Sequence, residues 1–322
     1  MNKSIAILIA LIVTSCKSNE EQQDKTSVAS SKEVTIAYKT EAALGEGAIW
    51  NDDTKQLYWV DIEGKTFNVF DPKTKENQSF PTATQIGTVV PKHNDEVLVA
   101  LVDGIYTLNL KTGNTAPFVD MGESLVNSRL NDGKCDPNGR LWVGSMNWQQ
   151  DKGKAKLFMI QNDSTVTTKM DSVTISNGIV WTKDKKTMYY IDTPTSQIKA
   201  YDYNDETGHI SNERVAVEIS EDLGFPDGMT IDADDMVWVG MWNGNAVIRF
   251  NPKTGALLEK IDVPAHNVTS CAFGGDHLET LYITTAKLDM TDEELKKYPL
   301  AGSLFKVKPG VKGVKSNAFK TH

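Results

Sequence analysis

The sequence has little cysteine and little histidine, and these shortages narrow the kinds of protein it can be. Its 322 residues include three cysteines and five histidines. Cys135 and Cys271 are too few and too far apart for a disulfide framework, so we expect both to be buried and unpaired. There is no Gly-x-Ser-x-Gly element, and the scattered histidines do not suggest a catalytic triad. Disulfide scaffolds and hydrolases with a serine elbow are therefore disfavoured.

An excess of positive charge is also missing. The chain has 34 Lys and Arg residues against 43 Asp and Glu residues, which gives a formal net charge of -9 at pH 7. No basic stripe appears along the sequence, so we expect no nucleic-acid partner. We expect a monomer that acts on a small molecule.

The first 16 residues have the composition of a targeting segment rather than of a folded domain. Lys3 supplies a positive start, residues 5–13 form an apolar run too short to span a bilayer, and residues 13–16 read Val-Thr-Ser-Cys. Small residues ahead of a cysteine are typical of a bacterial lipoprotein signal, which predicts lipidation of Cys16. The alternative is an ordinary signal peptide in which the cysteine is incidental.

Residues 17–32 contain almost no large apolar side chains and predict a flexible tether. No later apolar stretch approaches the length of a membrane-spanning helix, so the acyl chain would be the only attachment to a membrane. These features predict a lipoprotein anchored in the cell envelope, on a periplasmic or outer-membrane face. The acidic stretch 18–21 favours delivery to the outer membrane.

A short strand pattern of aromatic and β-branched residues recurs through the rest of the chain. Six copies are spaced roughly 40 to 50 residues apart, which is the period of a propeller blade. The copies begin at Leu57, Val97, Leu141, Met188, Val237 and Leu281. Because the period is even and no linker interrupts it, one large domain is favoured over a pair of β-sandwiches.

Turns rich in Asp, Asn, Lys and Gly border these strands and predict hairpins, as in residues 136–140 and 251–255. Helix signals are nearly absent, and the clearest is the capped polar segment 291–297. We therefore predict an all-β fold, a six-bladed β-propeller of four-stranded antiparallel blades. The propeller would occupy residues 33–316, followed by a tail at 317–322.

In four blades a polar residue next to a glycine precedes the recurring strand. The four segments are Gly45-Glu46-Gly47, Arg129-Leu130-Asn131-Asp132-Gly133, Ser176-Asn177-Gly178 and Pro226-Asp227-Gly228. Taken singly, Asn-Gly and Asp-Gly are ordinary turn dipeptides. Their repeated placement in successive blades predicts that the polar side chains converge at one mouth of the central channel.

Three of these residues, Glu46, Asn177 and Asp227, offer oxygen donors without any cysteine or histidine. Carboxylates in a narrow channel of low dielectric cost several kcal/mol unless a cation compensates them. Oxygen ligands suit Ca²⁺, Mg²⁺ or Mn²⁺ better than a structural zinc, although a zinc site completed by water stays open. We expect one divalent metal ion, with Ca²⁺ the first candidate.

Read together, these segments resemble the successive signatures of the gluconolactonase and regucalcin family, also called senescence marker proteins. The resemblance is carried by residues 45–50, 129–140, 175–178, 226–229 and 269–275. It extends over all six predicted blades, and the long Arg-Leu-Asn-Asp-Gly-Lys block is its most specific part.

The resemblance implies roles for five residues. Glu46, Asn177 and Asp227 would bind the metal, with Asp227 also the catalytic base. Arg129 and Asn131 would hold the substrate.

One feature of the family is missing. Members often carry an acidic substrate contact shortly after a Gly-Ser/Thr-Met stretch, but here residues 144–146 are followed by Asn147, Trp148 and Gln149. The resemblance therefore predicts the reaction more firmly than the sugar. Trp148, Gln149 and Trp242 are candidates for the wall of the substrate pocket.

The resulting hypothesis is a hydrolase of carbohydrate metabolism that opens a small sugar lactone. The metal would polarise the lactone carbonyl and stabilise the oxyanion, while Asp227 takes the proton of the attacking water. Three alternatives stay open. They are the hydrolysis of other esters or phosphotriesters on the same metal, a calcium-dependent sugar or peptide receptor without turnover, and a propeller scaffold that needs no metal.

Overall fold

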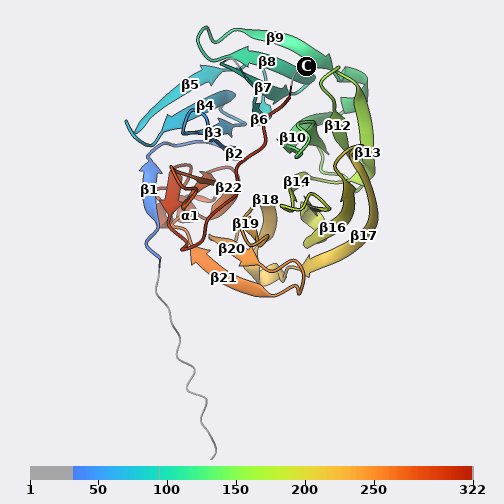
Figure 1. Cartoon of the computed structure of the whole chain (residues 1–322). Helices are drawn as coiled ribbons and strands as arrows, with labels where there is room; N and C mark the ends of the chain where they lie inside the picture. The colour runs from blue at the N-terminus through green and yellow to red at the C-terminus, as the bar shows by residue number, and fades with distance from the viewer. Residues whose placement is uncertain (1–31, 94, 321–322) are drawn as a thin grey trace, which may run out of the picture. The chain divides into compact units, whose positions relative to one another are not determined.

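The computed structural model describes residues 32–93 and 95–320, and within them the chain is almost entirely β-structure. Cys16 and residues 17–31 of the predicted tether lie outside the described residues. Six four-stranded antiparallel sheets are arranged around a common centre as the blades of a propeller (Figure 1). The predicted fold class is confirmed.

Five blades are built from four consecutive strands each, with the first strand innermost. Blades one and two consist of β2 (Gly45–Asn51), β3 (Gln56–Asp61), β4 (Thr66–Asp71), β5 (Glu76–Pro81), β6 (Ile86–Pro91), β7 (Glu96–Leu101), β8 (Gly104–Asn109) and β9 (Thr115–Asp120). Blade three consists of β10 (Ser128–Cys135), β11 (Leu141–Asn147), β12 (Ala155–Ile160) and β13 (Val166–Val173). Blades four and five consist of β14 (Ser176–Trp181), β15 (Thr187–Asp192), β16 (Gln197–Asn204), β17 (His209–Glu218), β18 (Phe225–Ile231), β19 (Val237–Trp242), β20 (Ala246–Phe250) and β21 (Leu257–Asp262).

The sixth blade joins the two ends of the described chain. It consists of β22 (Asn267–Gly274), β23 (Thr280–Ala286), β24 (Leu304–Val307) and the N-terminal β1 (Thr35–Tyr38). β1 pairs antiparallel with β24, with Thr35 opposite Lys306. The innermost strands contact one another in the ring order β2, β6, β10, β14, β18, β22 and back to β2. The pairing of β1 with β24 completes the sixth blade with a strand from the start of the described chain, and this closes the ring.

The six recurring strands of the sequence are the second strands of the blades, β3, β7, β11, β15, β19 and β23. They are buried on both faces, as in β7 and β11, because each blade packs between two neighbours. The outermost strands, such as β5, consist mostly of exposed polar residues and contain few buried ones. Cys135 and Cys271 are buried and unpaired, as expected.

Helices are few and short. They are the 3₁₀ turns η1 (Gly122–Leu125), η2 (Thr193–Thr195) and η3 (Glu221–Leu223), and the α-helix α1 (Asp292–Lys297). The helix α1 begins with the predicted capping box, in which the Thr291 side chain accepts a hydrogen bond from the Glu294 backbone N–H. Within residues 32–93 and 95–320 none of the helices is long and apolar enough to cross a membrane.

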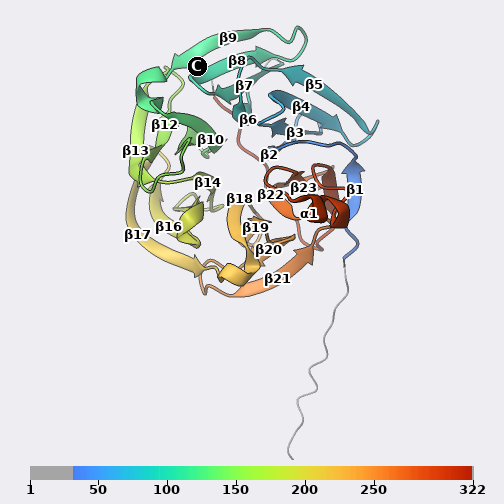
Figure 2. The ribbon, with the colours of Figure 1, turned by 180° about the vertical axis from the view of Figure 1, so that it is seen from behind.

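After β24 the chain crosses the centre of the ring on the face seen in Figure 1, at the opposite end of the channel from the face seen in Figure 2. Gly313 forms a β-bridge with Asp232 of blade five, and the backbone N–H of Phe319 donates to Pro91 of blade two. Phe319 is buried and packs edge to face on Phe118. Residues 317–320 of the predicted tail therefore pack on the propeller.

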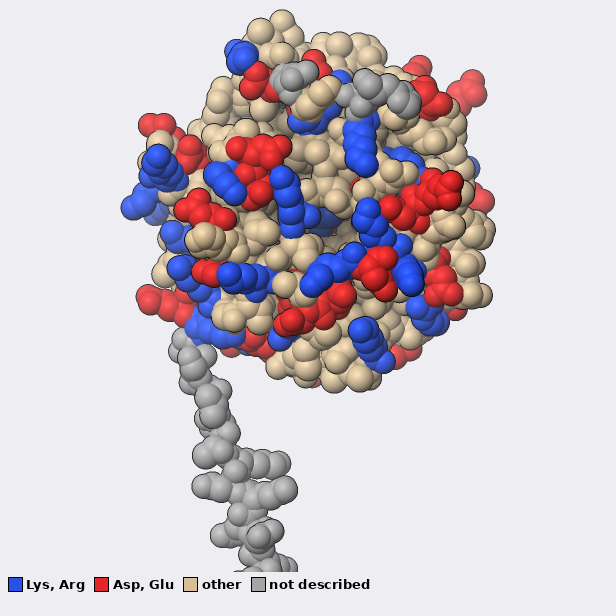
Figure 3. All heavy atoms as spheres, in the orientation of Figure 1, with Lys and Arg blue, Asp and Glu red and all other residues tan. Residues whose placement is uncertain are grey.

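This crossing segment covers the end of the channel where the innermost strands finish. A small cavity of about 60 Å³ remains there, lined by Lys134, Trp181 and residues 314–317 among others. Lys and Arg side chains gather around the central hollow of this face, interspersed with acidic ones (Figure 3). The other end of the channel, where the innermost strands begin, is the open one.

A buried charged network fixes the end of β10, the strand that carries Arg129 and Asn131. Asp136 accepts hydrogen bonds from Arg140 Nε at 2.7 Å, Trp142 Nε1 at 2.9 Å and the Tyr203 hydroxyl at 2.8 Å. The Asp136 side chain is fully buried. Because these donors come from blades three and four, the network ties the two blades together.

Replacing Asp136 by Ala should lower the free energy of unfolding by about 3 to 5 kcal/mol, because it leaves the Arg140 guanidinium buried without its counter-charge. Urea unfolding measures the loss. Asp202→Ala is the matched control, since its ion pair with Arg214 is about half exposed and should contribute little to stability. Equal losses in the two variants would contradict this account of the network.

Candidate active site at the channel mouth

A cavity of about 460 Å³ opens at the end of the channel where the innermost strands begin. The five residues to which the sequence assigned metal or substrate roles all line it. They are Glu46 on β2, Arg129 and Asn131 on β10, Asn177 on β14 and Asp227 on β18. All five are buried side chains, with 5 to 7% of their surface exposed. The structure thus brings together residues that are 181 positions apart in the sequence, from Glu46 to Asp227.

Irregular strand pairing explains why these side chains lie at the cavity. The register between first and second strands shifts between Glu46 and Ile49, between Ser176 and Ile179, and between Pro226 and Met229. Bulges of this kind re-aim the side chains next to them. The Asn-Gly and Asp-Gly pairs, which usually mark hairpin turns, therefore lie inside strands here.

The glycines beside the polar residues are required by close packing of the innermost strands. A Cβ atom on Gly178 would lie 2.4 Å from the Cβ of Met229 on the next blade. Gly47 has a φ of +61°, a conformation that residues with a side chain rarely adopt. Gly178 and Gly228 thus permit the approach of neighbouring blades, while the residues before them, Asn177 and Asp227, face the cavity.

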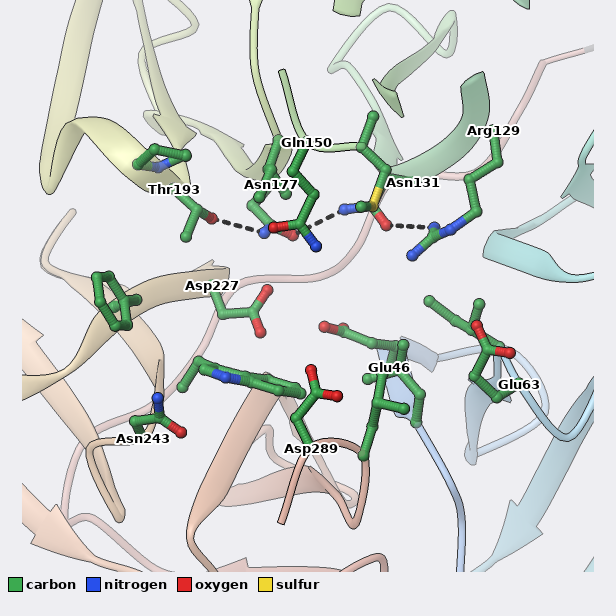
Figure 4. A pocket seen from close by; sticks show the side chains of 18 of the residues that line it. Glu46, Glu63, Arg129, Asn131, Gln150, Asn177, Thr193, Asp227, Asn243 and Asp289 are labelled. Atoms are coloured by element: carbon green, nitrogen blue, oxygen red, sulfur yellow. Dashed lines mark hydrogen bonds between the residues drawn. The ribbon is translucent and has the colours of Figure 1, made fainter. Parts of the chain in front are cut away.

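The carboxyl groups of Glu46 and Asp227 face each other across the base of the cavity (Figure 4). Burial and the nearby charge of Asp132 raise the pKa of Glu46 from 4.5 to about 7. Burial and the charge of Glu46 raise the pKa of Asp227 well above its ordinary value. Two carboxylates so placed are stable only with a shared proton or a bound cation.

A chain of hydrogen bonds orients the amide of Asn177. Its Nδ2 donates to Thr193 Oγ1 at 2.7 Å, and this hydroxyl donates in turn to the Pro226 carbonyl at 2.8 Å. Since the Thr193 hydroxyl donates its one hydrogen to the Pro226 carbonyl, it can only accept a hydrogen bond from Asn177. The amide is therefore held with its nitrogen on Thr193 and its oxygen, Oδ1, toward Asn131 (Figure 4).

Asn131 connects this amide to the only cationic side chain that lines the cavity in the described chain. Arg129 Nη1 donates to Asn131 Oδ1 at 2.6 Å, and Asn131 Nδ2 donates to Asn177 Oδ1 at 3.3 Å and to the Ser176 carbonyl at 2.7 Å. Burial lowers the pKa of Arg129, while the carboxylates of Glu63, Glu46 and Asp227 oppose this shift. Arg129 is thus fixed as a charged donor at the side of the cavity.

The donor set fits a divalent cation of the oxygen-preferring kind. Glu46 and Asp227 supply two carboxylates, and Asn177 Oδ1 retains a lone pair because it accepts a single hydrogen bond. Nearby, the buried Asp132 Oδ2 has no hydrogen-bond partner among the described residues, so one oxygen of a third carboxyl group is left unsatisfied. No three Asp, Glu, His or Cys side chains of the described residues converge as a metal site, and the Asn177 amide is the third oxygen donor beside Glu46 and Asp227.

The predicted pocket wall is placed residue by residue. Trp148 and Trp242 line the cavity, and Trp148 is 42% exposed at its rim. Gln149 does not line it; its Oε1 accepts a hydrogen bond from Asn147 Nδ2, and the next residue, Gln150, faces the cavity instead.

Several lining residues were missed by the sequence analysis. Thr193, Asn243, Glu63 and Asp289 line the cavity, as does Phe225 at the start of β18. The first four lie in the turns that follow the second strands of their blades, where Trp148 and Gln150 also lie. The signal that could have found them is therefore their position directly after each recurring strand.

These observations define a six-bladed β-propeller with a buried, oxygen-lined site at one mouth of its channel. Residues 44–287 match the SMP-30/Gluconolactonase/LRE-like region, and the chain belongs to this family. The resemblance read from the sequence is confirmed.

Named relatives match over most of their length. The chain is 39% identical over 269 residues to the "Putative sugar lactone lactonase YvrE" of Bacillus subtilis (strain 168), covering 83% of this chain and 91% of that protein. It is 35% identical over 282 residues to regucalcin of Xenopus laevis, covering 86% and 94%.

Solved structures show the same fold. A luciferin-regenerating enzyme superposes with a TM-score of 0.84 at 31% identity, covering 90% of this chain and 99% of that one. The calcium-binding protein regucalcin from Agrobacterium tumefaciens str. C58 gives a TM-score of 0.86 at 22% identity, covering 90% and 98%. All six blades are therefore shared with these structures.

The raised pKa of Glu46 predicts how the stability of the metal-free protein depends on pH. The unfolded chain loses this proton near pH 4.5, whereas the folded protein holds it to about pH 7. In this window the folded state binds more protons, so the free energy of unfolding should fall as the pH rises. Asp227, whose pKa is raised for similar reasons, acts in the same direction.

Urea unfolding of the chelator-treated protein at several values from pH 5 to pH 7 measures this slope. Glu46→Gln should flatten it, because the amide has no proton to lose. A free energy of unfolding that rises with pH in the wild-type protein, or a slope unchanged in Glu46→Gln, would contradict the assignment.

Proposed function

We propose that the protein is a metal-dependent hydrolase that opens a small sugar lactone. The observation that carries the proposal is the facing pair Glu46 and Asp227, held with the Asn177 oxygen and the Arg129 guanidinium at one channel mouth. The family name and the printed name of the Bacillus subtilis relative support the same reaction. A cavity of about 460 Å³ lies within the usual range for small-molecule sites.

Glu46, Asn177 and Asp227 are the residues that would hold the metal. Their oxygen atoms favour Ca²⁺, with Mg²⁺, Mn²⁺ and Zn²⁺ as competitors. When bound, a divalent cation at this place supplies electrostatic stabilisation for an oxyanion that forms at the lactone carbonyl. Thr193 contributes by keeping the Asn177 oxygen, rather than its NH₂ group, available.

Asp227 is the candidate general base. Its carboxylate lies at the cavity surface, where it can accept a proton from a water molecule that attacks the lactone carbonyl. A lactone is an activated ester, so a positioned carboxylate suffices without a covalent nucleophile.

Arg129 and Asn131 are the candidate substrate-binding residues. Arg129 uses Nη1 for Asn131 and the Leu130 carbonyl, which leaves Nε and Nη2 without a partner among the described residues. These donors can bind the oxygens of a lactone in the forked geometry of a guanidinium. Asn131 holds Arg129 in place and keeps one lone pair of Oδ1 for a substrate hydroxyl.

Asp227→Asn should lower kcat by about 10² to 10⁴-fold, because the amide can still offer an oxygen to the metal but cannot take a proton. Proton release from D-glucono-1,5-lactone, corrected for spontaneous opening, measures the rate. Chelation should abolish the activity and added Ca²⁺ should restore it.

Calorimetric titration of Asp227→Asn with Ca²⁺ gives the Ca²⁺ concentration that saturates the variant. The rates of the variant and the wild-type protein are then compared at that concentration. Asp171→Asn, an exposed residue of β13, is the control and should keep the wild-type rate. A wild-type rate in metal-saturated Asp227→Asn would overturn the assignment of the base.

We further propose that the protein is attached to the cell envelope through a lipid on Cys16. The support is the sequence of residues 1–16, with its short apolar run ending in a cysteine. The propeller would then face the periplasm or the exterior at the end of the tether.

Cys16→Ser should move the protein from the membrane fraction to the soluble fraction and abolish incorporation of labelled palmitate. Ser27→Ala, in the predicted tether, is the control and should leave both unchanged. Membrane retention of Cys16→Ser, or absence of label in the wild-type protein, would contradict the proposed anchor.

A further inference from the structure

The charges that line the cavity are strongly unequal. Four carboxylates line it, those of Glu46, Glu63, Asp227 and Asp289, against the single cation of Arg129 in the described chain. Glu46 and Asp227 are buried at the base, whereas Glu63 and Asp289 are exposed. A divalent ion would balance the buried pair and Arg129 would offset one of the two exposed carboxylates, so the lining keeps a net negative charge.

The exposed pair lies on loops that the fold holds in place. Glu63 belongs to the turn between β3 and β4, where Asp61 accepts hydrogen bonds from the backbone N–H groups of Ala43, Leu44 and Gly64. The Ile62 N–H also donates to the Leu44 carbonyl at 2.9 Å. This turn is therefore tied to the segment that leads into β2.

Asp289 follows β23, and its loop is tied to the same segment. The backbone N–H groups of Lys287 and Leu288 both donate to the Ala43 carbonyl, at 3.1 and 2.9 Å. Asn267 Nδ2 donates to the Leu288 carbonyl at 2.8 Å. Glu63 and Asp289 thus stand on two loops anchored at one point, on one side of the cavity, where both are seen in Figure 4.

Arg129 is the one basic side chain of the described chain that lines the cavity with these two carboxylates. Both carboxylates are exposed, and the charge of Glu63 acts on Arg129. The rest of the rim is neutral, with Trp148, Phe225 and Gln150 among its residues. An anionic group at the rim, away from Arg129, would therefore meet the repulsion of these two carboxylates.

The proposed reaction changes the charge of the ligand. Water adds its oxygen to the lactone carbonyl carbon, the ring C–O bond breaks, and the ring oxygen leaves as a hydroxyl group. The new carboxylic acid then loses its proton to solvent at neutral pH. A neutral ligand enters such a site, and an anion leaves it.

We propose that Glu63 and Asp289 form an acidic entrance that favours neutral lactones over lactones carrying a carboxylate or phosphate and that hastens the departure of the anionic product. This inference rests on the proposed function for its chemistry. The effect of Glu63 and Asp289 on binding depends only on the charge of the ligand, so it can be tested without the reaction.

The test compares the wild-type protein with the double variant Glu63→Gln and Asp289→Asn, saturated with Ca²⁺. Asn is suited to position 289, where φ is +60°. Glu76→Gln combined with Asp171→Asn removes two exposed carboxylates elsewhere and is the matched control. Tryptophan fluorescence reports binding, because Trp148 and Trp242 line the cavity.

The ligands for binding are D-glucose and D-glucose 6-phosphate, which are cyclic, differ in charge and cannot be hydrolysed as lactones. The ratio of their dissociation constants should shift by about threefold to tenfold toward the phosphate in the double variant, and not in the control. Binding of D-gluconate should tighten in the same way. Added salt should reduce the discrimination in the wild-type protein, because both carboxylates are exposed.

An unchanged ratio and unchanged gluconate binding in the double variant would overturn the acidic entrance. The kinetic counterpart compares D-glucono-1,5-lactone with its 6-phosphate. If no lactone is opened while the binding ratio shifts as expected, the proposed reaction fails and the entrance stands. If the lactones are opened, and the ratio of kcat/KM for the neutral lactone to kcat/KM for its 6-phosphate is the same in all three proteins, the acidic entrance is refuted and the proposed reaction stands.

Discussion

Two carboxyl groups held together away from water impose the main constraint on this protein. Glu46 and Asp227 face each other because six innermost strands pack around one channel. Burial raises both pKa values, together with the charge of Asp132 at Glu46 and the charge of Glu46 at Asp227. Such a pair is tolerated only if the surrounding structure cannot relax. The ring supplies this rigidity, since β1 and β24 close it into a single circuit.

The rigid and the variable parts of the site come from different places in each blade. Innermost strands supply Glu46, Asn131, Asn177 and Asp227 from bulges, where the backbone of the adjacent blade leaves little freedom. The turns after the second strands supply the rim. A family can therefore keep one chemistry at the base of the channel while the rim adapts to different ligands.

The two ends of the channel differ in how open they are. The C-terminal segment covers one end, where Phe319 is buried against Phe118 and only a small cavity remains. The opposite end stays open above the acidic pair. Within the described residues, a ligand therefore enters and leaves the channel at the open end. The carboxylates of Glu63 and Asp289 lie beside this opening and act on every ligand that passes.

Much of the fold could be predicted from the sequence, because each blade repeats a local pattern. Aromatic and β-branched residues with turns at a regular period are sufficient for a six-bladed propeller, and a polar residue before glycine marked the innermost strands. Glu46, Asn177 and Asp227 were found in this way, whereas the substrate roles of Arg129 and Asn131 came from the family resemblance. The buried cysteines and the capped helix α1 were also predicted from the sequence.

The sequence by itself determined the repeat, the blade boundaries and the candidate ligands, because these depend on short-range periodicity. Only the tertiary structure decided which turn residues reach the cavity. It placed Gln150 rather than Gln149 at the wall, added Thr193, and tied the loops of Glu63 and Asp289 to one segment although the chain separates them by most of its length. The physical reason is that ring closure joins the first blade to the last, and that proximity has no local signature.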